Sequence, residues 1–477
     1  MKIPVNKAKM VATFGPAIST KETYIEAVKT GVDVIRFNFS HGTHDDHSKG
    51  FELVRQVNKE LNLQIAILAD LQGPKIRVGD VDGEIELING SDVEIVDTPC
   101  KCTPKKIYIS YPKLFKEVNE EERILINDGL IELKVKKVTE GSIIAKVVYG
   151  GILTSRKGVN LPDSELKTPA LTDKDRKDLH FALLNGANWI ALSFVRKATD
   201  ILDMAKIIGE KRSYTKIIAK IEKPEAIKNI ESIIAVTDGI MVARGDLGVE
   251  IPQEQVPLVQ KRIINLCIKK AKPVIVATQM MESMINNPVA TRAEINDVAN
   301  AVIDGADAVM LSGETSVGKY PVKVLQTMQR ILTNIERSDL IYDKKLVASK
   351  NSKTYLADAI CYNACKIAKE VDAKAIVGMT KSGYTAFMIS SYRPKQQIFI
   401  FTDNEKLLPT LNLFWGVRAF LYSKFVGTDE TINDVIEILK INKHLKKGDI
   451  VVNTASMPLT KQGKTNTVKV SVVKDLE

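Results

Sequence analysis

Two apolar stretches of strand length end on charged residues whose types suit phosphate chemistry. Residues 217–219 run into Lys220 and Glu222, and residues 239–243 are followed closely by Asp246. In a parallel α/β sheet, side chains just past the carboxyl ends of strands gather around the ligand crevice. A lysine beside two carboxylates could hold a divalent metal next to a positive charge. This combination predicts phosphoryl transfer, in which a protein mainly positions groups and neutralises charge.

Four other strand-like runs also end on polar residues. The residues at the ends of the second, third, seventh and eighth runs are Arg36, Asn38, Ser40, His41, Asp70, Thr278, Ser312 and Glu314. Alternate strand residues point the same way. One such residue is usually an ordinary surface group, but six strands that end this way are hard to assign to chance. They predict one face lined with cations, carboxylates and hydroxyls.

The elements that must position these residues alternate regularly along the chain. Strands are expected at 10–14, 32–37, 64–69, 189–194, 216–219, 239–243, 273–277 and 308–311. Apolar spacing predicts helices at 21–30 after the Ser19-Thr20 cap, at 173–184 after Thr172, and at 253–270. Eight strand–helix units are typical of a (β/α)8 barrel. An open doubly wound sheet is the alternative, but no Gly-rich dinucleotide turn follows the first strand.

The connection after the third strand is far longer than a barrel loop. Between residues 73 and 167 the pattern changes to short alternating runs with Gly, Asn and Asp turns, as at 84–90 and 131–135. This predicts an inserted, β-barrel-like domain at the mouth of the barrel. A structural ornament would explain the same pattern. Attachment at the face with the polar residues favours a lid that closes over a substrate and excludes water.

A third pattern begins after residue 338. Strands are expected at 375–379, 397–401 and 449–453, with helical segments such as 354–370 between them. The predicted α/β protein therefore has a barrel of residues 1–72 and 168–338, a lid of residues 73–167, and a C-terminal α/β domain of residues 339–477 for regulation and assembly.

The first strand of the C-terminal domain runs into a small polar loop ahead of an expected helix. The loop consists of Thr380, Lys381, Ser382, Gly383, Tyr384 and Thr385. Its backbone N–H groups and hydroxyls could hold a phosphate. A plain strand-to-helix turn explains the same residues.

Composition sets broad limits on the class of protein. The 477 residues exceed one compact core, and 44% hydrophobic with 26% charged residues fits a soluble globular protein. No signal-peptide core is present, and no segment approaches the roughly 18 uninterrupted apolar residues of a membrane span. Five cysteines without metal-site spacing predict reduced thiols in a cytoplasmic enzyme. The net charge of +10 is interspersed with acids, which favours anionic small substrates over nucleic acid.

Six short stretches together resemble the pyruvate kinase family, and the resemblance extends along nearly the whole chain. They are Val11–Pro16, Arg36–Gly42, Lys220–Glu222, Met241–Gly248, Ala277–Met280 and Leu311–Thr315. The set is specific, although no single stretch would be. The resemblance implies transfer of the phosphoryl group of phosphoenolpyruvate to ADP, giving pyruvate and ATP. It also implies a homotetramer and Mg2+ as cofactor, with Mn2+ as an alternative.

The resemblance assigns roles to the residues around the substrate. Glu222 and Asp246 would hold the Mg2+, in agreement with the preference of this ion for hard oxygen ligands. Lys220 would stabilise the phosphoryl group in flight, and Arg36 would grip the same phosphate. Backbone N–H groups near Gly245 and Asp246 would take the substrate carboxylate.

Other roles follow in the same way. Thr278 would lie where the enolate is protonated, through water, with Ser312 and Glu314 behind it. The residues that resemble the nucleotide side of the site are His41, Arg77 and Lys157, the last at the return of the lid to the barrel.

One departure from the family pattern concerns the monovalent cation. Many members require K+ and have Thr-Lys and a Glu where this chain has Leu71-Gln72 and Lys75. This chain resembles the branch in which a lysine ammonium replaces the cation, since both together would add repulsion. The K+ ligands of the other branch would be Asn38, Ser40 and Asp70. We predict Mg2+ dependence without a K+ requirement.

Two other functions compete with this one. A metal-dependent lyase or mutase acting on oxo acids does not account for the inserted domain or the nucleotide-side residues. An inactive sensor of a phosphometabolite would be favoured by loss of Lys220, Glu222, Asp246 or Thr278, and all four are present. Tyr384 stands where some members have a basic residue, so the effector is either another phosphorylated metabolite or absent.

Overall fold

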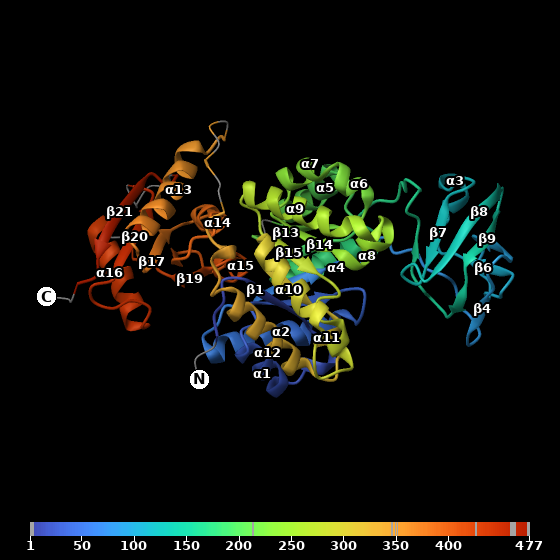
Figure 1. Cartoon of the computed structure of the whole chain (residues 1–477), viewed down its shortest axis with the longest axis horizontal. Coiled ribbons are helices and arrows are strands. Elements are labelled where there is room, and N and C mark those ends of the chain that lie inside the picture. Colours follow the sequence, from blue (N-terminus) through green and yellow to red (C-terminus); the bar gives the residue numbers. More distant parts are fainter. Residues whose placement is uncertain are drawn as a thin grey trace.

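The computed structural model describes residues 4–211, 214–344, 347–348, 350, 352–424, 427–457 and 464–474. It shows three parts in a row, with a barrel in the middle, a β-rich part at one end and an α/β part at the other (Figure 1). Within the described residues, eight parallel strands close into a barrel in the order β1, β2, β3, β12, β13, β14, β15, β16. The predicted fold class is confirmed, and the open doubly wound sheet is wrong.

The barrel strands are buried along most of their length, because the barrel interior and the surrounding helices cover both of their faces. Their bounds are β1 (Lys9–Thr13), β2 (Val34–Asn38), β3 (Ala66–Asp70), β12 (Trp189–Leu192), β13 (Lys216–Ile221), β14 (Gly239–Ala243), β15 (Val274–Ala277) and β16 (Ala308–Leu311). The helices are α1 (Lys21–Lys29), α2 (His44–Leu61), α4 (Asp173–Leu184), α5 (Ala198–Glu210), α6 (Pro224–Lys228), α7 (Ile230–Val236), α8 (Arg244–Glu250), α9 (Val256–Lys269), α10 (Arg292–Asp304), α11 (Gly313–Ser316) and α12 (Pro321–Ile335). Short 3-10 turns occupy Pro16–Ile18, Gln253–Gln255 and Glu282–Ile285.

Two strands end two residues away from the predicted end, and the other barrel strands end within one residue of it. β12 stops at Leu192 because Phe194, although apolar, has a left-handed backbone with φ of 54°. β13 continues past Ala219 to Ile221, which pairs with Val242 and is buried. The apolar pattern therefore predicted too late an end for β12 and too early an end for β13.

Threonine caps start two helices as predicted. The Thr20 hydroxyl accepts the N–H of Thr23 at the start of α1, and Thr172 with Asp175 forms a capping box at α4. Asp175 also accepts the N–H of Gly73 at 3.0 Å. The N-terminus of α4 therefore holds the point at which the chain leaves the barrel.

The inserted part has its own hydrophobic core. Its elements are β4 (Ile85–Leu87), β5 (Asp92–Val96), β6 (Lys106–Tyr108), α3 (Leu114–Glu117), β7 (Arg123–Ile126), β8 (Ile131–Thr139), β9 (Ser142–Tyr149), β10 (Gly151–Leu153) and β11 (Val159–Asn160). Six strands form a sheet in the order β11, β7, β8, β9, β5, β6. Isolated bridges from Arg77 to Gly158 and from Val78 to Ile109 link its two edges.

The C-terminal part is an α/β sheet in the order β19, β18, β17, β20, β21. Its elements are Asp339–Ile341 (a 3-10 turn), α13 (Tyr355–Glu370), β17 (Ala375–Met379), α14 (Tyr384–Ser391), β18 (Gln397–Thr402), α15 (Leu407–Leu411), β19 (Val417–Leu421), α16 (Thr428–Ile441), β20 (Ile450–Ala455) and β21 (Thr467–Val472). The apolar pattern did not predict β19 or β21. Both are edge strands whose partial exposure interrupts the apolar run.

A buried ion pair joins the C-terminal part to the amino ends of the barrel strands. The Arg393 guanidinium lies 2.9 Å from Asp307, which precedes β16, and donates to Gly305 O. Asp307 also accepts the N–H groups of Val274 and Trp415. The contact lies at the opposite end of the barrel from the polar residues that follow the strands.

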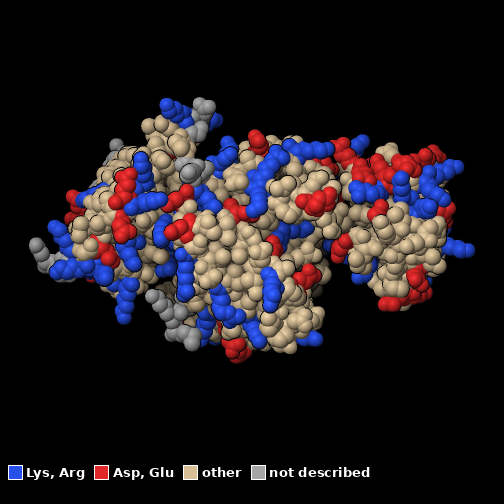
Figure 2. Space-filling view, viewed as in Figure 1, with Lys and Arg blue, Asp and Glu red and all other residues tan. Residues whose placement is uncertain are grey.

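The charges of the surface are mixed. Figure 2 shows lysine, arginine, aspartate and glutamate interspersed over one face of all three parts. Among the described residues, no helix combines the length and the apolar character that crossing a bilayer requires. All five cysteines are free thiols, and four of them are buried.

Candidate active site

The carboxyl ends of the barrel strands surround a cleft of about 1170 Å³. The predicted site residues that line it are Arg36, Asn38, Ser40, His41, Lys75, Lys220, Glu222, Asp246, Thr278 and Ser312. The predicted residues that do not line it are Asp70, Leu71, Arg77, Lys157, Gly245 and Glu314. The structure thus brings together side chains from strands that lie more than two hundred residues apart in the sequence.

Lys220 lies at the centre of a cluster of charges. Its ammonium is 2.9 Å from Glu222 Oε1 and 3.3 Å from Asp70 Oδ1. Burial opposes the charge of Lys220, but the two carboxylates outweigh burial and raise the pKa of Lys220 above its ordinary value. Lys220 is therefore a fixed positive charge, suited to stabilising a phosphoryl group rather than to accepting a proton.

Arg36 is held by groups on both neighbouring strands. Its Nε donates to Asp70 Oδ2 at 2.7 Å, and its Nη1 donates to Thr13 Oγ1 at 3.0 Å. Asp70 is only 1% exposed, and although burial opposes its charge, Lys220 and Arg36 lower its pKa. Asp70 therefore stays ionised and orients both cations toward the cleft.

Glu222 and Asp246 fit a divalent ion that shares its coordination with a substrate. Burial raises the pKa of Glu222; the Lys220 ammonium opposes this shift, and the negative charge of Asp246 adds to it. Glu222 is 1% exposed, its Oε1 pairs with the Lys220 ammonium at 2.9 Å, and its Oε2 accepts the N–H of Phe194. Within that part of the chain no three His, Cys, Asp or Glu side chains form a complete metal cage. Two carboxylates with positions left for phosphate and water are typical of Mg2+.

Thr278 has a strained backbone at the mouth of β15. Its φ is 67°, and that of Gln279 is 55°, which is a left-handed region that a β-branched residue rarely adopts. Arg244 donates to Thr278 O at 2.7 Å and pairs with Asp297. The Gly245 N–H donates to Thr278 Oγ1 at 2.7 Å. These contacts fix the hydroxyl beside the first turn of α8, a placement typical of functional sites that store strain.

Ser312 and Glu314 have different surroundings. Ser312 Oγ lines the cleft, is buried and lacks a hydrogen-bond partner among the described residues. Glu314 is 2% exposed and accepts the N–H groups of Ser312 and Met281 at 2.6 and 3.2 Å. Glu314 thus joins the loops after β15 and β16 without facing the cleft.

The predicted nucleotide side is partly assembled. Burial and the charges of Arg77, Lys75 and Arg36 lower the pKa of His41, which keeps its imidazole neutral near pH 7. Arg77 donates to Arg156 O at 2.9 Å, and Lys157 accepts the N–H of Val78 through its carbonyl.

The residues predicted around a monovalent cation separate into two groups. Asn38, Ser40 and Lys75 line the cleft, whereas Leu71 is 1% exposed and packs in the barrel core. Asn38 Oδ1 accepts the N–H of Ser40 at 3.1 Å. Asp70 is already engaged by two cations.

Ser193 and Phe194 are site residues that the sequence pattern did not predict. Ser193 Oγ accepts from Lys220 at 2.8 Å and donates to Leu71 O, and the Phe194 N–H donates to Glu222 Oε2 at 2.7 Å. Both residues fell within the strand predicted at 189–194, with Phe194 as its last residue. The change from apolar residues to Ser193 was the signal for the strand end, as at the other strands.

The predicted effector loop satisfies most of its own polar groups. Thr380 Oγ1 accepts the N–H of Gly383, and Ser382 Oγ accepts that of Tyr384. The Tyr384 hydroxyl donates to Thr354 and Asp358 on the side of α13, and Thr385 bonds to Thr465. A strand-to-helix turn accounts for this geometry.

Comparisons with known proteins agree with the fold. A model of the pyruvate kinase barrel domain matches residues 5–325, and one of the pyruvate kinase alpha/beta domain matches residues 358–471. A pyruvate kinase of Geobacillus stearothermophilus is 42% identical over 474 residues, covering 98% of this chain and 81% of the relative. One of Clostridium acetobutylicum is 42% identical over 478 residues, covering 98% of this chain and all of the relative.

A solved structure gives the same result. The crystal structure of a pyruvate kinase from Cryptosporidium parvum matches with a TM-score of 0.90 and 35% identity, covering 98% of this chain and 96% of that one. The barrel, the cleft at its carboxyl end and the similarity over nearly the whole length lead to one conclusion. The chain belongs to the pyruvate kinase family and is an enzyme of the transferase class.

Proposed function

We propose that this enzyme transfers the phosphoryl group of phosphoenolpyruvate to ADP with Mg2+ held by Glu222 and Asp246, and that it does so without K+. The observation that supports this most directly is the buried ammonium of Lys220 between Asp70 and Glu222. When bound, the divalent ion would neutralise charge on the phosphate and carboxylate oxygens of the substrate.

Lys220 and Arg36 would bind the phosphoryl group from one side of the cleft. Asp70 contacts both residues, so their charges are directed before the substrate arrives and little reorganisation accompanies the transfer. The substrate carboxylate would lie at the first turn of α8, where it competes with the Thr278 hydroxyl for the Gly245 N–H.

Loss of the phosphoryl group leaves the enolate of pyruvate, which needs a proton at its methylene carbon. Thr278 and Ser312 both line the cleft, and Ser312 Oγ has no hydrogen-bond partner among the described residues. We assign Thr278 the positioning of a water that gives this proton, with Ser312 next to it. Glu314 would act indirectly by holding the Ser312 backbone.

The K+ proposal depends on Lys75, an exposed cation at the edge of the cleft beside Asn38 and Ser40. Pyruvate formation should be equal within about twofold in K+-free buffer and with K+ added. Lys75→Glu should lower the rate without K+ by about tenfold or more, because a negative charge near the phosphate replaces a positive one, and K+ should restore part of the rate. Lys105→Glu, an exposed change in the lid, is the control. Strong K+ activation of the unaltered enzyme would refute the proposal.

The lid, the assembly and the effector are further parts of the proposal. Residues 73–167 would close over the substrates, with His41, Arg77 and Lys157 facing ADP. A homotetramer and a phosphorylated effector at the Thr380–Thr385 loop stay predictions. Sedimentation of the purified enzyme with and without candidate sugar phosphates would test both.

A further inference from the structure

Glu250 forms a buried link between the inserted part and the proposed metal ligands. It is the last residue of α8 and is 4% exposed. Its Oε1 accepts from Lys223 Nζ at 2.6 Å and from Asn160 Nδ2 at 2.8 Å. Asn160 ends β11, where the lid returns to the barrel, and Lys223 directly follows Glu222. One carboxylate oxygen therefore joins three separate segments.

The link connects the two segments that contain the proposed metal ligands. Asp246 and Glu250 are four residues apart on α8 and share one helix face. The Lys223 ammonium lies 6.0 Å from the ring of Phe194, whose N–H donates to Glu222 Oε2. The Lys223–Glu250 pair thus holds the turn that contains Glu222 against the helix that contains Asp246.

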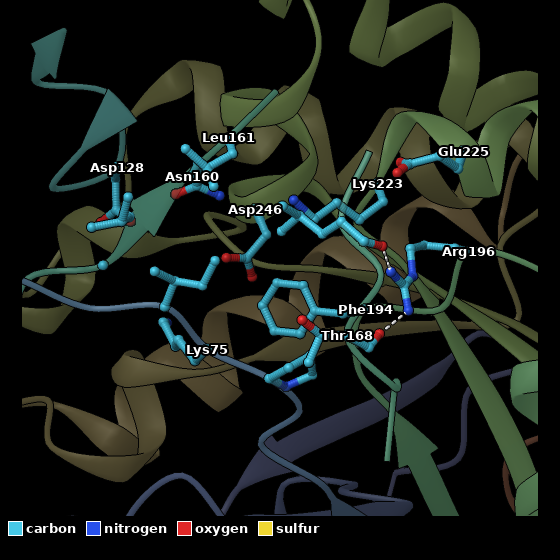
Figure 3. Close-up of a pocket in the computed structure, with 15 residues that line it drawn as sticks. Lys75, Asp128, Asn160, Leu161, Thr168, Phe194, Arg196, Lys223, Glu225 and Asp246 are labelled. Atoms are coloured by element: carbon cyan, nitrogen blue, oxygen red, sulfur yellow. Dashed lines mark hydrogen bonds between the residues drawn. The ribbon is translucent and has the colours of Figure 1, made fainter. Parts of the chain in front are cut away.

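The same pocket brings the lid residue to these segments. Figure 3 shows Asn160 on the lid strand and Lys223, Phe194 and Asp246 from the barrel around one pocket between the two parts. Asn160 therefore contacts the Lys223–Glu250 pair beside a pocket that the proposed metal ligand Asp246 also lines.

The chemistry of the three groups suits a contact that is made and broken. Lys223 and Glu250 both belong to the barrel, so their charges stay paired when the lid moves away, and no buried charge is left alone. The lid contributes only the neutral amide of Asn160. Oε2 of Glu250 is buried and has no hydrogen-bond partner among the described residues. The hydrogen bonds to Oε1 are therefore important for stabilising this buried carboxylate.

We propose that Glu250 is a positioning residue that couples docking of the lid through Asn160 to the geometry of the metal site. The proposal rests on the metal-ligand roles proposed for Glu222 and Asp246. Because coupling is reciprocal, a docked lid favours metal binding to the same extent that bound metal favours the docked lid.

The test compares two lid asparagines. Asn160→Ala removes the lid contact and leaves the Lys223–Glu250 pair intact. Asn119→Ala is the matched control, because Asn119 is an exposed lid residue that bonds to Glu122 within the lid. We expect the Mg2+ concentration for half-maximal activity to rise about tenfold in Asn160→Ala and to stay within about twofold in the control. The double variant Lys223→Met/Glu250→Gln removes the Lys223–Glu250 ion pair without leaving a buried charge. Its Mg2+ concentration for half-maximal activity should rise at least as much as in Asn160→Ala.

A second readout does not depend on activity. In the unaltered enzyme and in Asn119→Ala, Mg2+ should slow hydrogen exchange at the amides of β11, where the Val159 N–H bonds to Ile76 O. In Asn160→Ala this Mg2+ effect should be lost. A merely structural role of Asn160 would change exchange equally with and without Mg2+.

A further variant, Glu222→Gln, separates the two proposals. If Glu222→Gln leaves Mg2+ half-saturation unchanged, the proposed metal site is wrong. If Glu222→Gln raises it while Asn160→Ala behaves like the control in both readouts, the metal site stands and the coupling through Glu250 is overturned.

Discussion

Lys220 keeps its charge in a buried place because Asp70 and Glu222 surround it. Arg36 balances the other oxygen of Asp70, so each cation has an anionic partner before any substrate binds. Such an arrangement differs from a general base, whose pKa would lie near the working pH. At the scale of single residues the site is therefore organised to stabilise negative charge.

Replacing Lys220 tests this arrangement. Lys220→Met should lower kcat by about 10²–10³-fold, because the charge on the transferring group loses its fixed counter-charge. Glu222 and Asp246 remain, so Mg2+ should still bind, measured by calorimetry. Circular dichroism should show the native fold. The control is Lys216→Met, at the other end of β13 and paired with Asp238. Near-normal turnover of Lys220→Met would remove Lys220 from its assigned role.

At the scale of elements, the N-terminus of α4 fixes both connections of the lid. Asp175 caps the helix through Thr172, on the returning chain, and accepts the N–H of Gly73 on the outgoing chain. One buried carboxylate thus sets where the lid starts and where it ends. The position of Lys75, two residues after Gly73, depends on this cap.

Comparing Asp175 with the neighbouring Asp173 tests whether the hydrogen bonds of Asp175, rather than a negative charge at this helix end, stabilise the fold. Asp175→Ala should lower the free energy of unfolding by about 2–4 kcal/mol, since it removes the carboxylate half of the capping box and leaves the N–H groups of Thr172 and Gly73 without their acceptor. It should also raise KM for ADP. Asp173→Ala, on the exposed side of the same turn, should change stability by less than about 0.5 kcal/mol. Equal effects of both changes in urea denaturation would contradict this role.

At the scale of the whole molecule, the barrel and the C-terminal part meet through buried charges. Arg393 and Asp307 form one pair. Lys7 forms a second contact, because its ammonium donates to Pro394 O and Gln396 O while its N–H donates to Glu336. These contacts lie at the amino ends of the barrel strands, so they secure the C-terminal part without entering the cleft.

Removing the cation of the buried pair should be costly. Arg393→Met should lower the free energy of unfolding by about 3–5 kcal/mol, because Asp307 stays buried without its counter-charge. Adding Asp307→Asn should recover part of that loss. Denaturant titration of both variants and of the single Asp307→Asn change gives the coupling energy. Additive effects would show that the pair does not act as a unit.

Glu336 should make the stability of this junction depend on pH. Burial raises its pKa to about 7, although the N–H groups of Ala8 and Lys7 oppose the shift. The folded state thus holds a proton that the unfolded chain releases near pH 4.5, so this stabilisation is complete below that pH and is lost as pH rises through about 7.

Glu336→Gln keeps the two N–H bonds and removes the titration. Relative to the variant, the free energy of unfolding of the unaltered enzyme should fall by about 1–2 kcal/mol between pH 5 and pH 7.5. Thermal unfolding at a series of pH values measures this difference. Lys7, whose pKa is lowered to about 7 by burial, acts in the opposite direction above that pH. Glu26→Gln on the exposed side of α1 is the control, and parallel pH profiles for Glu336→Gln and the unaltered enzyme would refute the assignment.

The sequence by itself determined the barrel, the insertion after β3 and the strand ends on which most of the cleft residues lie. Buried parallel strands must be apolar throughout, so Lys220, Asp246 and Thr278 stand out at their ends. Local patterns also gave the helix caps. These features depend on neighbours in the chain, which is why they could be predicted.

Only the tertiary structure decided which of several candidate partners each polar group meets. Glu314 bonds to backbone N–H groups, Gly245 donates to Thr278, and Ser193 accepts from Lys220. Glu250 meets Asn160 across ninety residues of chain. Such pairs form when the barrel closes and the lid folds back onto it, and their distances depend on packing between segments that no local pattern connects.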